Sequence, residues 1–149
     1  MQVAEVGAKR SVLEQEDTFF GVKQGRLKLR EIRGGQAYLI YYERADEGGA
    51  KVSEYKTADV KDLAATKELL GAACGVTKTV RKVRQLFLQG QTRLHFDEVE
   101  GLGRFIEIEV CLQPGQSEAV GRRIADDWVS RLKIQPEDLV AGAYADLLK

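Results

Sequence analysis

The stretch from Thr92 to Leu112 constrains the fold more than any other part of the chain. Two short runs of alternating apolar and polar residues flank the turn Gly101-Leu102-Gly103. In the first run, Leu94 and Phe96 alternate with charged or polar side chains. A period of two is typical of a β-strand with one apolar and one polar face. The stretch is therefore predicted to be a β-hairpin that carries charge on one face.

The register of this hairpin decides which charged groups meet. If the hairpin is centred on Leu102, Asp97 lies opposite Glu107 and His95 lies opposite Glu109. The three carboxylates would then lie side by side on one face. Like charges placed directly opposite one another repel. We therefore expect a cation between them, either a metal ion or neighbouring Lys and Arg side chains.

A second hairpin is predicted to present the opposite charge. In the run from Gly25 to Glu31, leucines alternate with cations, namely Arg26, Lys28 and Arg30. Gly34-Gly35 follows and predicts a two-residue turn, with a return strand from Gln36 to Arg44. That turn would place Lys28 opposite Tyr41.

Val76 to Gln89 is predicted to be a long strand that adds more cations. Its alternation places Lys82 and Arg84 on one face together with Val80 and Leu86. A turn at Gly90-Gln91 then leads into the first hairpin and would set Arg84 against Asp97.

The remaining elements are predicted from caps and apolar spacing. Ser117 is expected to cap a helix, and Gly75 to end one that spans Asp62 to Ala73. Trp128 and Tyr144 are interpreted as core packing. The other predicted elements are strands at Val12 to Phe20 and Val52 to Thr57, the Ser117-capped helix with the stripe Val120, Ile124, Trp128 and Leu132, and a short helical turn at Pro136.

Composition narrows the classes of function. The 149 residues are expected to form a single domain, residues 1–149, and Lys plus Arg equals Asp plus Glu at 23 each. No overall field therefore favours a nucleic acid or a membrane as partner. No long apolar run or signal peptide is present, so a cytoplasmic protein is expected. Cys74 and Cys111 are interpreted as reduced and structural, and His95, the single histidine, as a polar strand position rather than a ligand or a base.

Several strands therefore share one design, with charge on one face and apolar residues on the other. Such an antiparallel sheet can lie open with its charge in water. It can also close around the charge with helices packed outside. The closed form would create a polar tunnel in which Lys and Arg bind phosphate oxygens while carboxylates hold Mg²⁺ or Mn²⁺.

Short segments along the chain carry a family resemblance. The most specific is Asp97-Glu98-Val99-Glu100-Gly101-Leu102-Gly103 followed by Glu107-Ile108-Glu109. The others are Gln15-Glu16-Asp17-Thr18-Phe19-Phe20, Gly25 to Glu31, Tyr41 to Arg44 and Arg81 to Arg84. From about Leu13 to Leu148 the pattern resembles the CYTH family, also called triphosphate tunnel metalloenzymes, which includes class IV adenylate cyclases and thiamine triphosphatases.

The resemblance implies an α+β fold, an antiparallel barrel of about eight strands with helices packed outside. It implies metal-dependent chemistry on a small molecule that contains a triphosphate, with Mg²⁺ or Mn²⁺ as cofactor. The implied phosphate-binding residues are Lys28, Arg30, Lys82 and Arg84. The implied metal ligands are Asp97, Glu107 and Glu109, of which Glu107 and Glu109 are also the expected catalytic residues.

The chain departs from the family pattern at its start. CYTH proteins open with a strand that bears E-x-E-x-K, and nothing before Val12 matches it. We expect a barrel that is one strand short, with an open sheet edge that another chain could fill in a homodimer. Three functions stay open: a triphosphate hydrolase, a class IV-type adenylate cyclase, and a non-catalytic module that binds triphosphates or nucleotides. Tyr41-Tyr42-Glu43 replaces a lysine that is found in thiamine triphosphatases, which argues against a thiamine-specific substrate.

Overall fold

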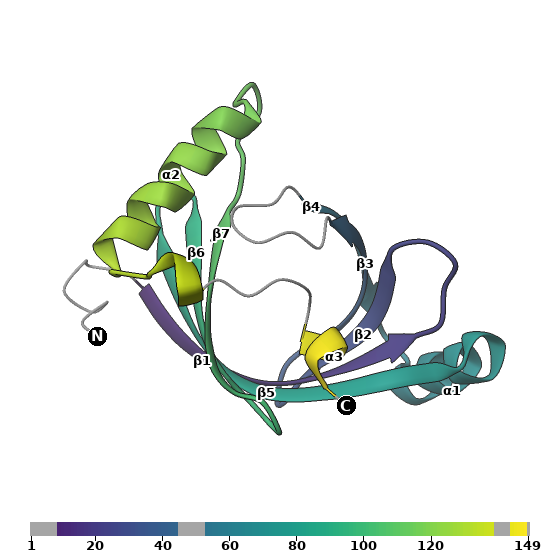
Figure 1. Cartoon of the computed structure of the whole chain (residues 1–149). Helices are drawn as coiled ribbons and strands as arrows, with labels where there is room; N and C mark the ends of the chain where they lie inside the picture. The colour runs from purple at the N-terminus through teal and green to yellow at the C-terminus, as the bar shows by residue number, and fades with distance from the viewer. Residues whose placement is uncertain (1–8, 45–52, 139–143, 149) are drawn as a thin grey trace.

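The chain folds around one strongly curved antiparallel sheet, shown in Figure 1. This computed structural model describes residues 9–44, 53–138 and 144–148. Within them the sheet has seven strands in the order β4-β3-β2-β1-β5-β6-β7. The strands are β1 (Lys9–Phe20), β2 (Arg26–Ile32), β3 (Ala37–Arg44), β4 (Ser53–Val60), β5 (Val76–Gln89), β6 (Thr92–Val99) and β7 (Gly103–Val110).

The two longest strands form the middle of the sheet. The pairing of β1 with β5 runs from Lys9 opposite Leu88 to Phe20 opposite Val76, with one irregularity beside Phe20. The predicted bounds of β5 are confirmed. The predicted strand from Val12 to Phe20 begins three residues earlier, at Lys9.

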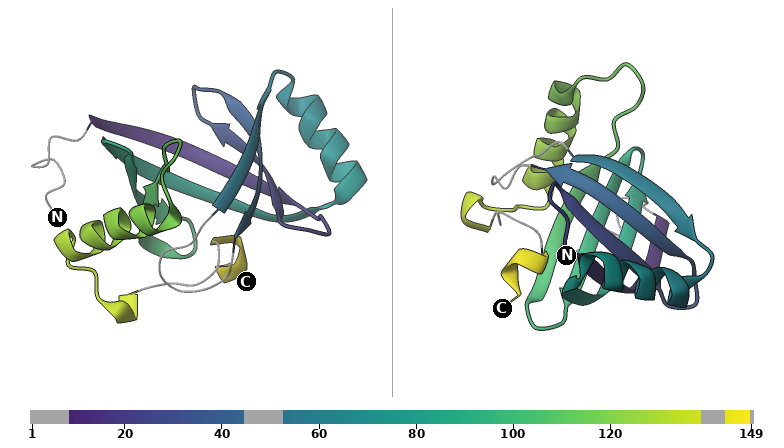
Figure 2. Two further views of the ribbon diagram at one scale, coloured as in Figure 1. Left: turned by 90° about the horizontal axis from the view of Figure 1, so that it is seen from above. Right: turned by 90° about the vertical axis from the view of Figure 1, so that its right-hand side faces the viewer.

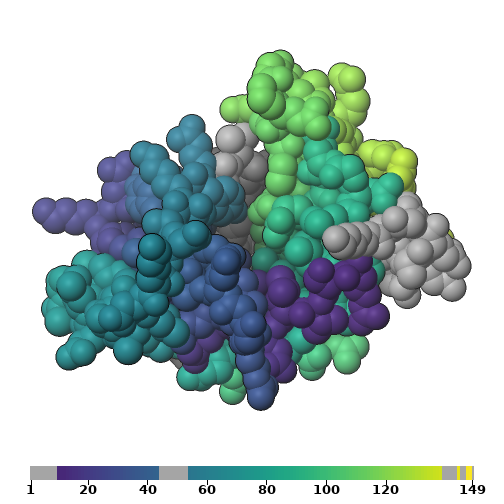
Figure 3. Space-filling view, turned by 180° about the vertical axis from the view of Figure 1, so that it is seen from behind, coloured from purple at the N-terminus to yellow at the C-terminus, as the bar shows by residue number. Residues whose placement is uncertain are grey.

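The sheet curls so that its two ends approach the same side of the molecule. Its strands β3 and β4 on one flank and β6 and β7 on the other rise around a concave face (Figure 1). From behind, the atoms of these two flanks lie on opposite sides of the molecule (Figure 3). Among the described residues, β4 and β7 are the two edge strands and do not pair with each other. The antiparallel sheet with outside helices is confirmed. The predicted closure into a barrel of about eight strands, or of one strand fewer, is not seen within the described ranges.

Two helices pack on the outside of the curve, at opposite ends of the sheet (Figure 2). Helix α1 (Leu63–Cys74) lies near β1 and helix α2 (Glu118–Arg131) packs against β7. Asp62 caps α1 by accepting a hydrogen bond from the amide of Ala65, and Ser117 caps α2 in the same way. Both predicted helix starts are therefore confirmed. No helix of the described chain is long and apolar enough to cross a membrane.

The core under α2 explains why this helix stays on the sheet. Trp128 is 5% exposed and packs with Phe87 and Leu94 of the convex face. Partly buried side chains surround this cluster, namely Phe96, Ile108, Ile124 and Leu132. The prediction that Trp128 is core packing is confirmed.

The C-terminal helix lies on the opposite face of the sheet from α1 and α2. The predicted turn at Pro136 is a 3-10 turn (Pro136–Asp138), and a short helix, α3, follows at Tyr144–Leu147. Tyr144 and Leu148 pack against a second buried cluster that consists of Phe19, Val80 and Val99. Because these strand residues alternate with the convex ones, α3 lies against the concave face.

The predicted register of the β6–β7 hairpin is wrong by two residues. Asp97 lies opposite Phe105, while Glu107 lies opposite His95 and Glu109 opposite Arg93. The hairpin is centred on Gly101, whose φ of 83° is the left-handed conformation that glycine adopts readily, and not on Leu102. A shift of two keeps every side chain on its predicted face but separates the carboxylates.

The β2–β3 hairpin differs from its prediction by one residue. Its loop has three residues rather than two, and it closes with the amide of Ile32 donating to the carbonyl of Gln36 at 3.2 Å. Gly34, at φ 71°, supplies the left-handed position within it. The odd shift exchanges the faces of β3, so that Lys28 meets Ile40 instead of Tyr41.

Removing the Trp128 side chain tests the core under α2. Trp128→Ala should lower the free energy of unfolding by about 3–5 kcal/mol, because a large buried ring leaves a cavity. Leu69→Ala on α1 serves as the control, since Leu69 is 66% exposed, and it should cost less than about 0.5 kcal/mol. Urea unfolding followed by circular dichroism measures both. Equal losses would contradict the packing.

Candidate anion and metal site

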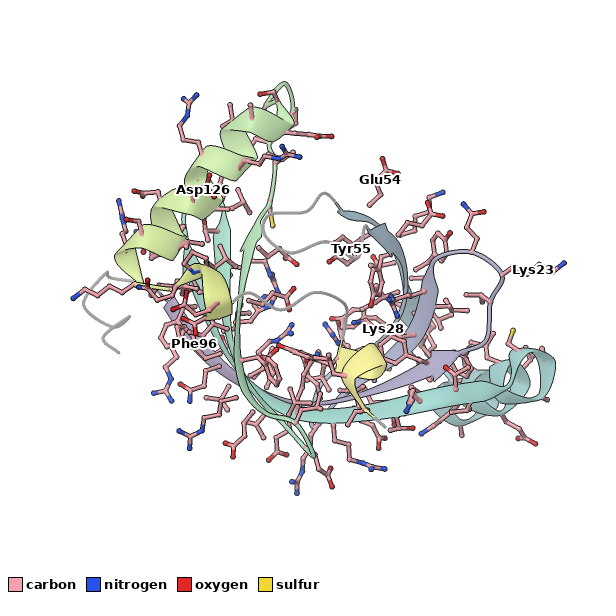
Figure 4. All side chains as sticks on the ribbon, viewed as in Figure 1. Lys23, Lys28, Glu54, Tyr55, Phe96 and Asp126 are labelled. Carbon is pink, nitrogen blue, oxygen red and sulfur yellow. The ribbon has the colours of Figure 1, made fainter. Side chains whose placement is uncertain are left out.

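The concave face gathers most of the buried charge of the described chain. Asp17, Lys82, Arg84, His95 and Asp97 are each at most 6% exposed. Alternation along the strands brings them to one side, as Lys28 and Tyr55 on the concave side and Phe96 on the convex side illustrate in Figure 4. We call this set, together with Lys28, Arg30, Arg93, Glu107 and Glu109, the charged face.

At the centre of the charged face one carboxylate contacts three cations. Asp17 accepts two hydrogen bonds from Arg30, from Nε and from Nη2, each at 2.8 Å. The ammonium of Lys28 lies 3.2 Å and that of Lys82 lies 3.4 Å from Oδ2 of Asp17. This meeting follows from topology, because β1 lies between β2, which carries Lys28 and Arg30, and β5, which carries Lys82.

The cluster changes the acidity of its members. Burial alone would raise the pKa of Asp17, but Lys28 and Arg30 outweigh it and hold this pKa far below its usual range. Burial lowers the pKa of Lys28 to about 8 and that of Lys82 to about 7, although Asp17 opposes both shifts. The two lysines therefore titrate near neutral pH.

A second buried pair lies on β5 and β6. Arg84 donates from Nε and Nη2 to the two oxygens of Asp97, at 2.8 Å each, a fork-like arrangement that favours a fixed geometry. The predicted register, Arg84 opposite Asp97, is confirmed. Burial opposes the charged form of each partner, yet the ion pair raises the pKa of Arg84 and lowers that of Asp97.

Tyr144 joins this pair from α3. Its hydroxyl donates to Oδ2 of Asp97 at 2.9 Å, and the Nζ atom of Lys82 lies 5.1 Å from its ring centroid. The ring also packs against Phe105, with the centroids 5.1 Å apart. Tyr144 is thus core packing, as predicted, and in addition it is a hydrogen-bond donor on the charged face, which the sequence did not indicate.

The two glutamates of β7 have unequal surroundings. Glu109 lies 3.1 Å from Nε of Arg93. Glu107 has two nitrogen neighbours, Nη2 of Arg84 and Nδ1 of His95, each 3.8 Å from its Oε2. Both separations exceed the length of a hydrogen bond. Burial would raise the pKa of Glu107, but His95 and Arg84 hold it well below its usual range.

The carboxylates of Asp97, Glu107 and Glu109 are the right kind of ligand for a divalent cation, but they do not converge on one point. Carboxylate oxygens suit hard cations such as Mg²⁺ and Mn²⁺. Within the described ranges, however, no three acidic, His or Cys side chains converge as a ready metal cage. Asp97 is paired with Arg84 and Glu109 with Arg93, whereas Glu107 has no neighbour at hydrogen-bond distance among the contacts just given. Mg²⁺ commonly takes one or two carboxylates and completes its shell with substrate phosphates, and of the three carboxylates Glu107 has the longest contacts with its cationic or imidazole neighbours.

The structure brings the predicted site residues to one face and adds others. Lys28, Arg30, Lys82 and Arg84 surround the two buried acids, and Asp97, Glu107 and Glu109 lie along one end of the same face. Asp17 was missed as a functional residue. Its signal was an acid directly before Thr18-Phe19-Phe20 that, unlike its neighbour Glu16, shares the strand face of Phe19.

Comparison with known proteins agrees with the fold. A family model for the CYTH domain matches residues 3–144. The PH1012 protein of Pyrococcus horikoshii superposes with a TM-score of 0.87 at 26% identity, over 99% of this chain and 90% of that one. A conserved hypothetical protein of Pyrococcus furiosus gives a TM-score of 0.83 at 21% identity, over 99% and 90%.

A candidate adenylate cyclase of Vibrio parahaemolyticus is also similar, with a TM-score of 0.76 at 18% identity over 93% of this chain and 84% of that one. No curated protein sequence matches the chain.

Neutralising the central carboxylate tests the cluster. Asp17→Asn should lower the free energy of unfolding by about 3–5 kcal/mol, because it leaves buried cations without their counter-ion. Glu14→Gln is the matched control on the same strand, since the pair of Glu14 with Arg33 is exposed and is expected to contribute less than about 1 kcal/mol. Chemical unfolding at pH 7 compares the two. If Asp17→Asn costs no more than the control, the cluster does not organise this face.

The lysine acidities predict how anion binding depends on pH. As pH rises from 6 to 9, Lys82 and then Lys28 lose their protons, with pKa values of about 7 and about 8. Metal-free affinity for inorganic triphosphate should therefore fall across this range. Lys82→Met should flatten the lower part of the curve of affinity against pH. Because the ionisation of triphosphate itself is the same for both proteins, the difference between their curves reports Lys82. Isothermal titration calorimetry measures both curves. Parallel curves for the wild-type protein and Lys82→Met would show that Lys82 does not cause the pH dependence.

Proposed function

The chain belongs to the CYTH domain family, and from this premise we propose that it is a metal-dependent phosphohydrolase of inorganic or organic triphosphates. The observation that carries the proposal is the cation cluster around Asp17. Three cations lie within 3.4 Å of one buried carboxylate. Arg84 adds a fourth cation, paired with Asp97. The positive groups are therefore concentrated around Asp17 and Asp97, while Glu107 and Glu109 lie at one end of the same face. A polyanion is the ligand that such a surface favours.

The proposed roles of the cations follow from their contacts. Lys28, Arg30, Lys82 and Arg84 would bind the phosphate oxygens of the substrate. Asp17 and Asp97 hold the two guanidinium groups in fixed orientations through paired hydrogen bonds. Fixed donors aimed at phosphate oxygens stabilise charge that develops during phosphoryl transfer without having to reorganise.

The proposed roles of the acids centre on β7. Glu107 and Glu109, with Asp97, would hold Mg²⁺ or Mn²⁺ together with phosphate oxygens of the substrate. A cation bound there would neutralise phosphate charge and lower the pKa of a bound water. The weakly engaged carboxylate of Glu107 is the group that would exchange its present neighbours most easily.

A cavity beside the cluster supports organic triphosphates among the substrates. It has a volume of about 420 Å³ and is lined by Phe19, Arg26, Lys78 and six other residues. Phe19 also lies under the ammonium of Lys28, 5.5 Å from Nζ to the ring centroid. The cavity and the proposed phosphate site thus have Phe19 in common, and the part of a substrate beyond its phosphates would extend into this cavity.

The similarity to the candidate adenylate cyclase of Vibrio parahaemolyticus favours one alternative. A class IV-type cyclase would use the same charged face, with a ribose hydroxyl of ATP as nucleophile in place of water. The ion pairs of Asp97 and Glu109 favour the other alternative, a non-catalytic module that binds triphosphates or nucleotides, because these acids are already occupied by Arg84 and Arg93.

One assay separates the three functions. Inorganic triphosphate, ATP and thiamine triphosphate are each incubated with the protein and Mg²⁺ or Mn²⁺. Release of free phosphate is expected for the hydrolase. Cyclic AMP from ATP would instead identify a cyclase. Saturable binding without any product would identify the binding module, and neither binding nor turnover would refute the proposal.

Removing the charge of Glu107 tests the metal role. Glu107→Gln should reduce metal-dependent turnover by a factor of about 100 or more, because a carboxylate ligand becomes a neutral amide. The fold and metal-free binding of inorganic triphosphate should be preserved, as thermal unfolding and calorimetry would verify. Glu98→Gln on β6 is the control, since Glu98 lies on the opposite face. Unchanged turnover in Glu107→Gln would exclude Glu107 from the site.

A further inference from the structure

His95 is a buried polar side chain whose hydrogen-bonding capacity is unused. It is 2% exposed, and neither Nδ1 nor Nε2 has a hydrogen-bond partner within the described part of the chain. Buried polar groups nearly always have a partner, and an unsatisfied one calls for an explanation. Its interpretation as an ordinary polar strand position does not account for this burial.

The surroundings of His95 point to Glu107. Across the sheet, His95 lies opposite Leu86 on β5 and opposite Glu107 on β7. Leu86 offers no polar atom in its side chain. Nδ1 lies 3.8 Å from Oε2 of Glu107, so a movement of about 1 Å would bring the two atoms to hydrogen-bond distance.

The neighbours along β6 have closer partners than Glu107, and Arg84, which is also 3.8 Å from Glu107, forms its short contacts with Asp97. Arg93 is paired with Glu109, and Asp97 with Arg84. Each of the other acids on this part of the charged face thus has an arginine within 3.1 Å, whereas the near neighbour of Glu107 across the strand is an imidazole. The imidazole can donate a single hydrogen bond to the carboxylate while leaving its second oxygen available.

We propose that His95 is a positioning residue for Glu107. In the loaded site, the Nδ1–H group donates to one oxygen of Glu107 and so turns the other oxygen toward the divalent cation that accompanies the triphosphate. This inference rests on the proposed function. Groups that orient a metal ligand in this way typically change metal affinity or activity by about 10- to 100-fold when they are removed.

Variants at His95 test the proposal through metal dependence. His95→Leu should raise the Mg²⁺ concentration for half-maximal binding, in the presence of inorganic triphosphate, by about 10- to 100-fold. His95→Asn keeps a donor close to the position of Nδ1 and should recover most of that loss. The matched control is Thr18→Val on β1, because the Oγ1 atom of Thr18 is also buried without a partner among the described residues but lies on the convex face. This control should leave Mg²⁺ dependence unchanged.

NMR of the wild-type protein tests the proposal even if the His95 variants do not fold. His95 is the single histidine of the chain, so ¹⁵N-labelled histidine gives one unambiguous imidazole signal. In the wild-type protein we expect the Nδ1-protonated tautomer, and a shift of the Nδ1 resonance when Mg²⁺ and inorganic triphosphate are added together. Glu107→Gln should lack most of this shift.

The outcomes separate the two proposals. If the wild-type protein binds no Mg²⁺ with triphosphate, the proposed function fails and this role for His95 fails with it. If it binds both, the role alone is overturned by any of three results: unchanged Mg²⁺ dependence in folded His95→Leu, no recovery in folded His95→Asn, or an Nδ1 resonance that does not respond to the loaded site.

Discussion

The contact between Asp17 and three cations is the constraint on which the charged face depends. Lys28, Arg30 and Lys82 come from two strands that flank β1, and without a shared counter-ion they would repel one another at close range. A buried ion cluster of this kind is weak evidence for stability as such. Its value lies in geometry, because one carboxylate fixes where the positive groups of separate strands lie.

The faces of most strands could be predicted from the sequence, whereas the face of β3 and the registers of the β2–β3 and β6–β7 hairpins could not. Alternation around Lys28, Lys82 and Glu107 assigns each side chain to a face, and the structure keeps these assignments. Register depends on which residue occupies the centre of a turn. Gly101 and Gly34 both take left-handed conformations, but each lies among several residues that could hold the centre, so spacing alone did not identify them.

Other features depended on contacts between distant segments. Asp17 could be seen as an unusual acid in a strand, but its partners come from β2 and β5 and became visible only with the strand order. Tyr144 follows β5 and β6 by a long stretch of chain, and nothing in its local sequence indicates a hydrogen bond to Asp97. The resemblance to the CYTH family suggested the set of residues, and the strand pattern predicted Arg84 opposite Asp97, while the pairing of Glu109 with Arg93 became visible only in the structure.

The lysines beside Asp17 have a consequence for the energetics of ligand capture. With pKa values of about 8 and about 7, Lys28 and Lys82 are only partly charged in a neutral solution. A polyanion that settles between them stabilises their ammonium forms and draws hydrogen ions from the medium. Capture at neutral pH is therefore coupled to net uptake of protons, and the heat it releases varies with the ionisation enthalpy of the buffer.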